Sequence, residues 1–207
     1  MKHNDFTVYS NKNSLYNDVF VEISDTNIII DEVFEIIAKP IKLIPNNIPF
    51  NNHLTLIYEN NINEISGGSI YNYNINKEEW IHMENINYND SINPSKIKTK
   101  IYSGGIFALL NETNGPTISN ISPANDSIYK SNDLNEISFK IIDEYSKINY
   151  DSIEVKIDNE SLNYEYIPYR DMVRCNIINK LIQGYHTFEI FAQDRLGNAS
   201  IKKGTFL

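Results

Sequence analysis

The 207-residue chain carries 27 acidic and 18 basic residues, a net charge of −9, and 41% of its residues are hydrophobic. This hydrophobic content argues against a disordered chain, and an acidic surface without a basic stripe repels phosphate, which makes nucleic acid a poor partner. The sequence has no apolar run long enough to cross a membrane as a helix, and its single cysteine excludes an intramolecular disulfide.

Alternation of polar and apolar residues dominates the first half of the chain and predicts strands rather than helices. The clearest alternation is Ser69–Ile75, and the polar turn that follows leads into Trp80, so we expect a hairpin here. We expect Gly104 and Gly105 to bend the chain into the last strand of this half. The predicted strands are about residues 6–9, 18–24, 32–38, 53–59, 69–75, 79–83, 96–102 and 105–110.

A polar stretch that contains Gly115 and Pro116 follows these strands and separates two strand-rich blocks. Such stretches are typical of domain boundaries. We therefore expect an all-β protein made of two tandem β-sandwich domains, residues 1–114 and residues 115–207, the second of them immunoglobulin-like.

Short strands separated by regularly spaced turn signals fill the second half, which is typical of an immunoglobulin-like sandwich. In the best-defined strand, residues 185–193, the side chains of Phe188, Ile190 and Ala192 share one face. A turn with Gly197 at the expected positive-φ position then leads into the last strand. The predicted strands are about residues 117–121, 135–142, 152–157, 162–168, 172–178, 185–193 and 199–206.

Short motifs in the second half occur in a recognisable order. They are Pro116-Thr117-Ile118, Asp143–Ile148, Ser152–Asp158, Gly184–Thr187 and Ala192–Asn198. In this order they resemble the bacterial immunoglobulin-like or fibronectin-III-like modules of large exported proteins. The resemblance implies a β-sandwich fold and specifies no activity.

The first half is similar to another β-domain, through the hairpin that bears Trp80 and the strand Gly105–Leu109. It resembles the domain that precedes such a module in the C-terminal regions of some lysostaphin-type peptidase-like surface proteins. A peptidase of that family needs a His-x-His pair with a further His and Asp to hold zinc. The histidines here are His3, His53, His82 and His186, and no two lie two residues apart, so the resemblance implies a non-catalytic part.

Tyrosines and the one tryptophan are the candidate ligand-binding residues. Tyr71 and Tyr73 share one sheet face on the hairpin that bears Trp80, and Tyr164 and Tyr166 lie on another strand-like run. These rings either pack into a core, which is commoner, or present a flat platform to sugar rings or peptide.

Asp143, Asp158 and Asp194 lie at predicted strand ends and are the candidate metal ligands, for calcium (Ca²⁺), because carboxylates that gather at one end of a sandwich bind this cation. None of them lies in an Asp-x-Asp-x-Asp loop, and turn capping explains them without a metal. We therefore expect no cofactor, with calcium as the alternative.

The sequence contains no Gly-x-Ser-x-Gly motif and no phosphate-binding glycine loop, and we expect no catalytic residue. Cys175 lies in a strand-like run and is predicted to be a buried thiol. His186 shares the parity of Phe188, which predicts a hydrogen-bonded histidine at the edge of the core. The enzyme alternative is a hydrolase whose site joins His186 to Asp143 and Asp194.

These observations predict a non-catalytic structural or binding module of a secreted or surface bacterial protein, which positions or anchors a neighbouring domain. The expected location is outside the cell, at its surface or in the periplasm. Met1–Asp5 lacks the apolar core of a signal peptide, so if the protein is exported we expect this chain to be a piece of a longer precursor. Expected partners are neighbouring domains and cell-wall glycan or protein. The remaining alternative is an adhesin or assembly subunit that uses its sheet-face aromatics or an edge strand.

Overall fold

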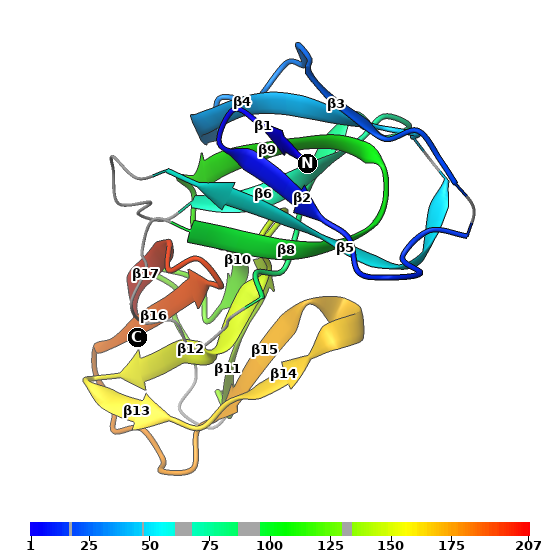
Figure 1. The fold of residues 1–207 in the computed structure, drawn as a ribbon. Helices are drawn as coiled ribbons and strands as arrows, with labels where there is room; N and C mark the ends of the chain where they lie inside the picture. The colour runs from blue at the N-terminus through cyan, green and yellow to red at the C-terminus, as the bar shows by residue number, and fades with distance from the viewer. Residues whose placement is uncertain (17, 47, 61–67, 87–95, 130–133) are drawn as a thin grey trace. The chain divides into compact units, whose positions relative to one another are not determined.

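The computed structural model describes residues 1–16, 18–46, 48–60, 68–86, 96–129 and 134–207, and it folds these mainly into β-strands (Figure 1). Among these residues the only helical element is a short 3-10 helix, η1 (Pro168–Arg170), so the expected all-β class is confirmed. No helix in the described part of the chain is long and apolar enough to cross a membrane. The chain divides into two compact units, Met1–Thr113 and Asn114–Leu207.

The first unit is a sandwich of two antiparallel sheets. In strand order, one sheet contains β1 (Lys2–His3), β2 (Phe6–Tyr9), β5 (Pro49–Glu59) and β8 (Lys96–Ser103). The other contains β3 (Glu22–Asp25), β4 (Phe34–Ile44), β9 (Gly105–Glu112), β6 (Gly68–Asn74) and β7 (Glu79–His82). Apolar side chains at alternate positions of both sheets, among them Leu43, Leu56 and Leu109, form a common core.

The second unit is also a sandwich of two antiparallel sheets. One sheet has the order β10 (Thr117–Ser122), β11 (Glu136–Ile142), β15 (Met172–Asn176) and β14 (Glu165–Ile167). The other has the order β13 (Glu160–Leu162), β12 (Ile148–Ile157), β16 (His186–Asp194) and β17 (Ala199–Phe206). Phe139 and Val173 from the first sheet and Val155 and Ile190 from the second are buried in the core between them.

Several predicted strands differ from the observed ones where the alternation is interrupted. The strand predicted at 162–168 is divided into β13, β14 and η1. β4 extends to Ile44 rather than ending near residue 38. Pro40 and two register irregularities interrupt the alternation of polar and apolar residues, but they do not end the strand. Gly197 has a φ of +94°, which confirms the predicted turn before β17.

Candidate binding pocket

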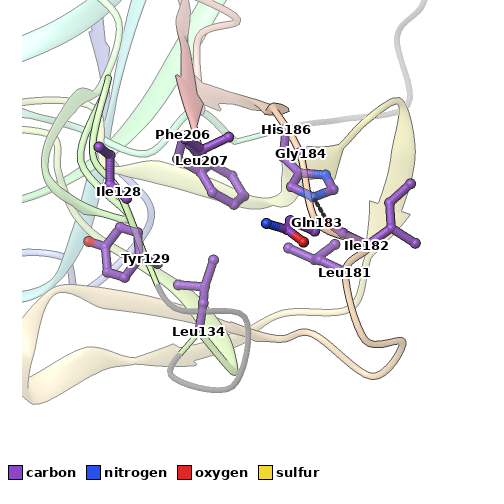
Figure 2. Close-up of a pocket in the computed structure, with 10 residues that line it drawn as sticks. All are labelled: Ile128, Tyr129, Leu134, Leu181, Ile182, Gln183, Gly184, His186, Phe206 and Leu207. Carbon is purple, nitrogen blue, oxygen red and sulfur yellow. Dashed lines mark hydrogen bonds between the residues drawn. The ribbon is translucent and has the colours of Figure 1, made fainter.

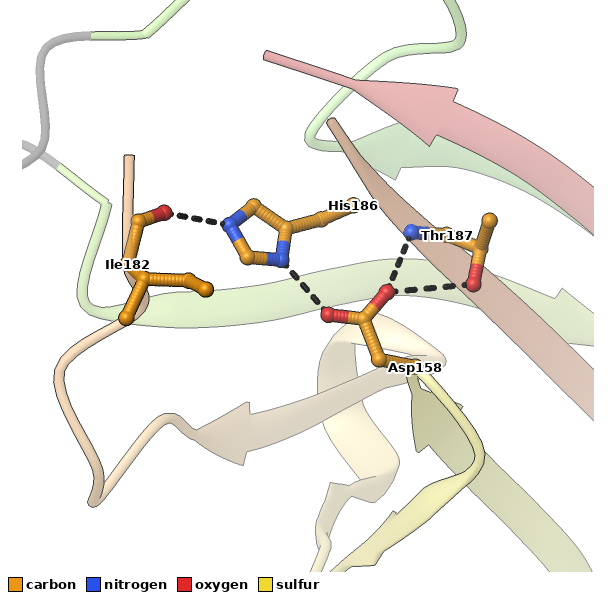
Figure 3. A network of polar contacts seen from close by, with 4 residues as sticks. All are labelled: Asp158, Ile182, His186 and Thr187. Atoms are coloured by element: carbon orange, nitrogen blue, oxygen red, sulfur yellow. Dashed lines mark hydrogen bonds and ion pairs between the residues drawn. The ribbon is translucent and has the colours of Figure 1, made fainter. Parts of the chain in front are cut away.

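A two-residue turn between β12 and β13 places the carboxylate of Asp158 beside the start of β16. Asp158 and Asn159 have φ values of 49° and 68°, as a tight hairpin of this kind requires, and Asp and Asn tolerate positive φ better than most residues. Asp158 Oδ1 accepts the backbone N–H of Thr187 at 2.8 Å and its hydroxyl at 3.2 Å (Figure 3). These bonds join the hairpin to β16.

His186 has both ring nitrogens in contact with groups that accept hydrogen bonds (Figure 3). Its Nδ1 lies 2.6 Å from Asp158 Oδ2, and its Nε2 lies 2.7 Å from the carbonyl oxygen of Ile182. A carbonyl oxygen cannot donate and the carboxylate is ionised below neutral pH as above it, so these contacts fit a ring with a proton on each nitrogen, the imidazolium form. The side chain is buried, with its ring centroid 5.5 Å from that of Phe206.

The pKa values of the two partners shift in the directions that this ion pair requires. The hydrogen bond to Asp158 raises the pKa of His186, and the bond to the Ile182 carbonyl adds to the rise, whereas burial opposes it. Burial pushes the pKa of Asp158 upward, but the hydrogen bonds from His186 and Thr187 outweigh it, so the pKa is lowered. An imidazolium without a free lone pair cannot act as a general base or bind a metal.

The bond to the Ile182 carbonyl holds the segment that precedes β16, and this segment forms one wall of a pocket of about 410 Å³ (Figure 2). Leu181 and Gln183 line this wall. Ile128 and Leu134 line another side, and Phe206, at the end of β17, lies between the two. Figure 2 shows the Gln183 amide extending into the pocket. Of the residues that line the pocket, Gly184 and His186 belong to the sequence motif Gly184–Thr187; the others come from three separate segments and no local pattern indicates them.

Two of the five candidate aromatic residues are buried in the first unit. Tyr71 is fully buried, with its ring 5.0 Å from that of Phe34, and Trp80 is only 2% exposed. Tyr73 is half-buried and lies 5.1 Å from Trp80 between ring centroids. Tyr71 and Trp80 are therefore not available as a platform. The neighbouring residues Ile70 and Tyr71 point to opposite faces of β6 and are both buried, so both faces of this strand are covered.

The other two candidates, Tyr164 and Tyr166, are half-buried against the core of the second unit. The ring of Tyr166 lies 4.4 Å from that of Tyr150, and the Tyr164 hydroxyl donates a hydrogen bond to the Tyr150 carbonyl. Burial raises the pKa of Tyr166, and its contact with the Tyr150 hydroxyl raises it further. Tyr150, Tyr164 and Tyr166, the tyrosine group, thus combine packing with partly accessible ring surface.

The candidate metal ligands Asp143 and Asp194 both cap turns. Asp143 Oδ1 accepts the backbone N–H of Lys147 at 2.7 Å, and Asp194 Oδ1 accepts those of Leu196 and Asn198 at 2.8 Å each. Carboxylate oxygens of the two aspartates lie within 4.8 Å of each other. Burial raises the pKa of Asp143, and the negative charge of Asp194 adds to this rise against the hydrogen bonds of the turn.

The pairing of β12 with β16 places Asp158 and His186 far from Asp143 and Asp194. Ile148 pairs with Asp194 and Ile157 pairs with Phe188, so Asp158 lies at the opposite end of β12 from Asp143 and Asp194. The three acids are therefore not brought together. His186 and Asp194 lie at opposite ends of β16, roughly 26 Å apart for an extended strand, so the site that joins His186 to Asp143 and Asp194 does not form.

Two further reactive side chains among the described residues, those of Cys175 and Ser69, are fully buried. Cys175 is fully buried, and burial raises the pKa of its thiol to about 12, which keeps it neutral. Ser69 contacts His82 Nε2 at 2.8 Å, a pair that the sequence did not suggest, but the serine is fully buried and out of reach of a substrate.

No protein-family model matches the chain, and no curated protein matches it. The function of the chain is therefore inferred from the chemistry of its own side chains.

Proposed function

We propose that the chain is a non-catalytic structural and binding module of a secreted or surface bacterial protein, which positions or anchors a neighbouring domain. The observation that carries this proposal is the state of His186. The side chain is buried, and both of its nitrogens are engaged by Asp158 and by the Ile182 carbonyl. A histidine in this state stabilises the loop before β16 and has no lone pair with which to take a proton from a substrate.

The strand order of the second unit supports an immunoglobulin-like module. Its sheets have the orders β10-β11-β15-β14 and β13-β12-β16-β17. If β10, β11 and β12 are strands A, B and C of that fold, these orders correspond to A-B-E-D and C′-C-F-G. Modules of this kind space and present other domains, and the resemblance of the first half to lysostaphin-type surface proteins adds a cell-wall setting.

Binding to purified bacterial cell walls, followed by sedimentation, tests the proposal. We expect the chain to sediment with the walls in a saturable manner and to release no soluble sugar or peptide from them. The two readouts separate anchoring from hydrolysis in a single sample. Absence of saturable binding would contradict the anchoring role, and release of fragments by the purified chain would contradict the non-catalytic one.

A second candidate function, glycan or protein binding as an adhesin, is favoured by the tyrosine group. Tyr150 is 39% exposed and lies against Tyr166, which leaves ring surface to which a sugar can stack. In the same sedimentation assay, Tyr150→Ser should weaken binding if the tyrosines hold the ligand. Tyr9→Ser, which alters an exposed tyrosine of the first unit, is the matched control and should not weaken it.

A further inference from the structure

We propose that the pocket beside His186 is a binding site for a small neutral molecule, or a neutral chemical group of a larger one, with an apolar body and one hydrogen-bonding end. Its volume of about 410 Å³ lies within the range of small-molecule sites, which are typically about 300–1,000 Å³. This site is separate from the proposed cell-wall anchoring and does not depend on it.

The lining of the pocket determines the apolar part of the ligand. Leu134, Leu181 and Phe206 supply its walls, and Ile128 and Ile182 at its rim are 79% and 81% exposed. These side chains line one pocket together with its apolar walls, and exposed apolar surface that is contiguous marks interaction sites. An aromatic ring or a branched aliphatic group fits this lining.

The described residues that line the pocket favour an uncharged ligand. No Lys, Arg, Asp or Glu is among these described residues. The one charged residue among them, His186, is already paired with Asp158 and has no N–H left to donate. An ionic ligand would lose water here without gaining a partner of opposite charge.

Gln183 provides the polar contact. Its amide extends into the pocket, and the described residues offer it no hydrogen-bond partner (Figure 2). An amide both donates and accepts, so it can pair with a hydroxyl or amide of the ligand. The bond between His186 and the Ile182 carbonyl holds the backbone next to Gln183, so part of the entropic cost of ordering this segment is met before the ligand arrives.

Titration of the whole chain with p-cresol, followed by NMR of its ¹³C-labelled methyl groups, tests the site. We expect saturable shifts of the Leu134, Leu181 and Ile128 methyls at about millimolar p-cresol, the affinity typical of so small a ligand. The methyls of Leu56, in the core of the first unit, should not shift. Shifts spread evenly over exposed isoleucines such as Ile29, or no saturable shift, would overturn the proposal.

Variants and a charged probe refine the test. Gln183→Ala should weaken p-cresol binding about fivefold, the effect of one neutral hydrogen bond, whereas Gln193→Ala on β16 should not change it. Leu181→Asp should abolish binding, and benzoate should not bind to the wild-type chain. Benzoate binding as tight as that of p-cresol would contradict a neutral ligand. Sedimentation with cell walls measures the anchoring role independently, so either proposal can fail alone.

Discussion

Replacement of His186 by Gln should destabilise the second unit by about 1–2 kcal/mol. The variant loses the hydrogen bond to Asp158 and the one to the Ile182 carbonyl. Hydrogen bonds to charged groups are worth about 1.5–3 kcal/mol each. The Asp158 side chain is 44% exposed and Ile182 is 81% exposed, so water replaces much of what is lost, and we expect a value near the lower end. For a unit of this size each kcal/mol lowers the melting temperature by about 4–8 °C.

The destabilisation should depend on pH with a definite sign. The pKa of His186 is raised above 6.5 in the folded chain, so its contribution is complete below pH 6.5 and is lost as the pH rises through the raised value. The pKa of Asp158 is lowered below 3.8, so its contribution is complete above pH 3.8 and is lost as the pH falls through the lowered value. The difference between wild type and His186→Gln should therefore be greatest between pH 3.8 and 6.5 and should shrink in alkaline solution.

Urea unfolding followed by circular dichroism, at pH 5.5 and pH 9, measures this difference. The fluorescence of Trp80, the one tryptophan, reports the first unit in the same samples. His53→Gln is the matched control, because among the described residues the hydrogen bond of the His53 ring goes to the exposed Asn52 side chain next to it, and it should change stability by less than about 0.5 kcal/mol. An effect of His186→Gln that is absent, or equally large at both pH values, would refute the reasoning.

Trp80 should emit at short wavelength and resist quenching by acrylamide in the native chain, because its side chain is 2% exposed; emission like that of free tryptophan would contradict its burial. The Cys175 thiol should react with Ellman's reagent at pH 8 much more slowly in the native chain than in urea, since it is buried and its pKa is raised to about 12; equal rates would contradict this. Gly104→Ala should destabilise the first unit by at least about 2 kcal/mol, measured by Trp80 fluorescence, because the new Cβ would lie 2.1 Å from the Pro45 carbonyl oxygen. Ser103→Ala is the control, and an equal effect of the two substitutions would show that the close backbone approach is unimportant.

The sequence predicted the strands best where one face alone is buried. In β16 the buried residues alternate from His186 to Asp194, and the predicted strand differs by one residue at each end. β12 was predicted to begin at residue 152 but begins at Ile148, because a register irregularity between Asn149 and Glu154 breaks the alternation. Local pattern therefore identifies regular strands and misses those that contain bulges.

The predicted nature of His186 is confirmed, since it is a hydrogen-bonded histidine at the edge of the core. Its partner was not foreseen, and Asp158 was grouped with Asp143 and Asp194 instead. Which carboxylate contacts the histidine depends on the pairing of β12 with β16, and Asp158 and His186 are themselves 28 positions apart in the chain. Such non-local register is not encoded in any single segment. The same limit explains why the pocket, assembled from three segments, could not be predicted.

The protonation state of His186 tests the central claim most directly, because the non-catalytic proposal depends on this buried side chain being a structural cation. ¹⁵N NMR of the imidazole across a pH titration of the whole chain measures it. We predict that at pH 6 both ring nitrogens carry protons and that the ring titrates with a pKa above 6.5. A neutral ring at pH 6, with one unprotonated nitrogen and a pKa at or below 6.5, would contradict the claim and make His186 available as a base.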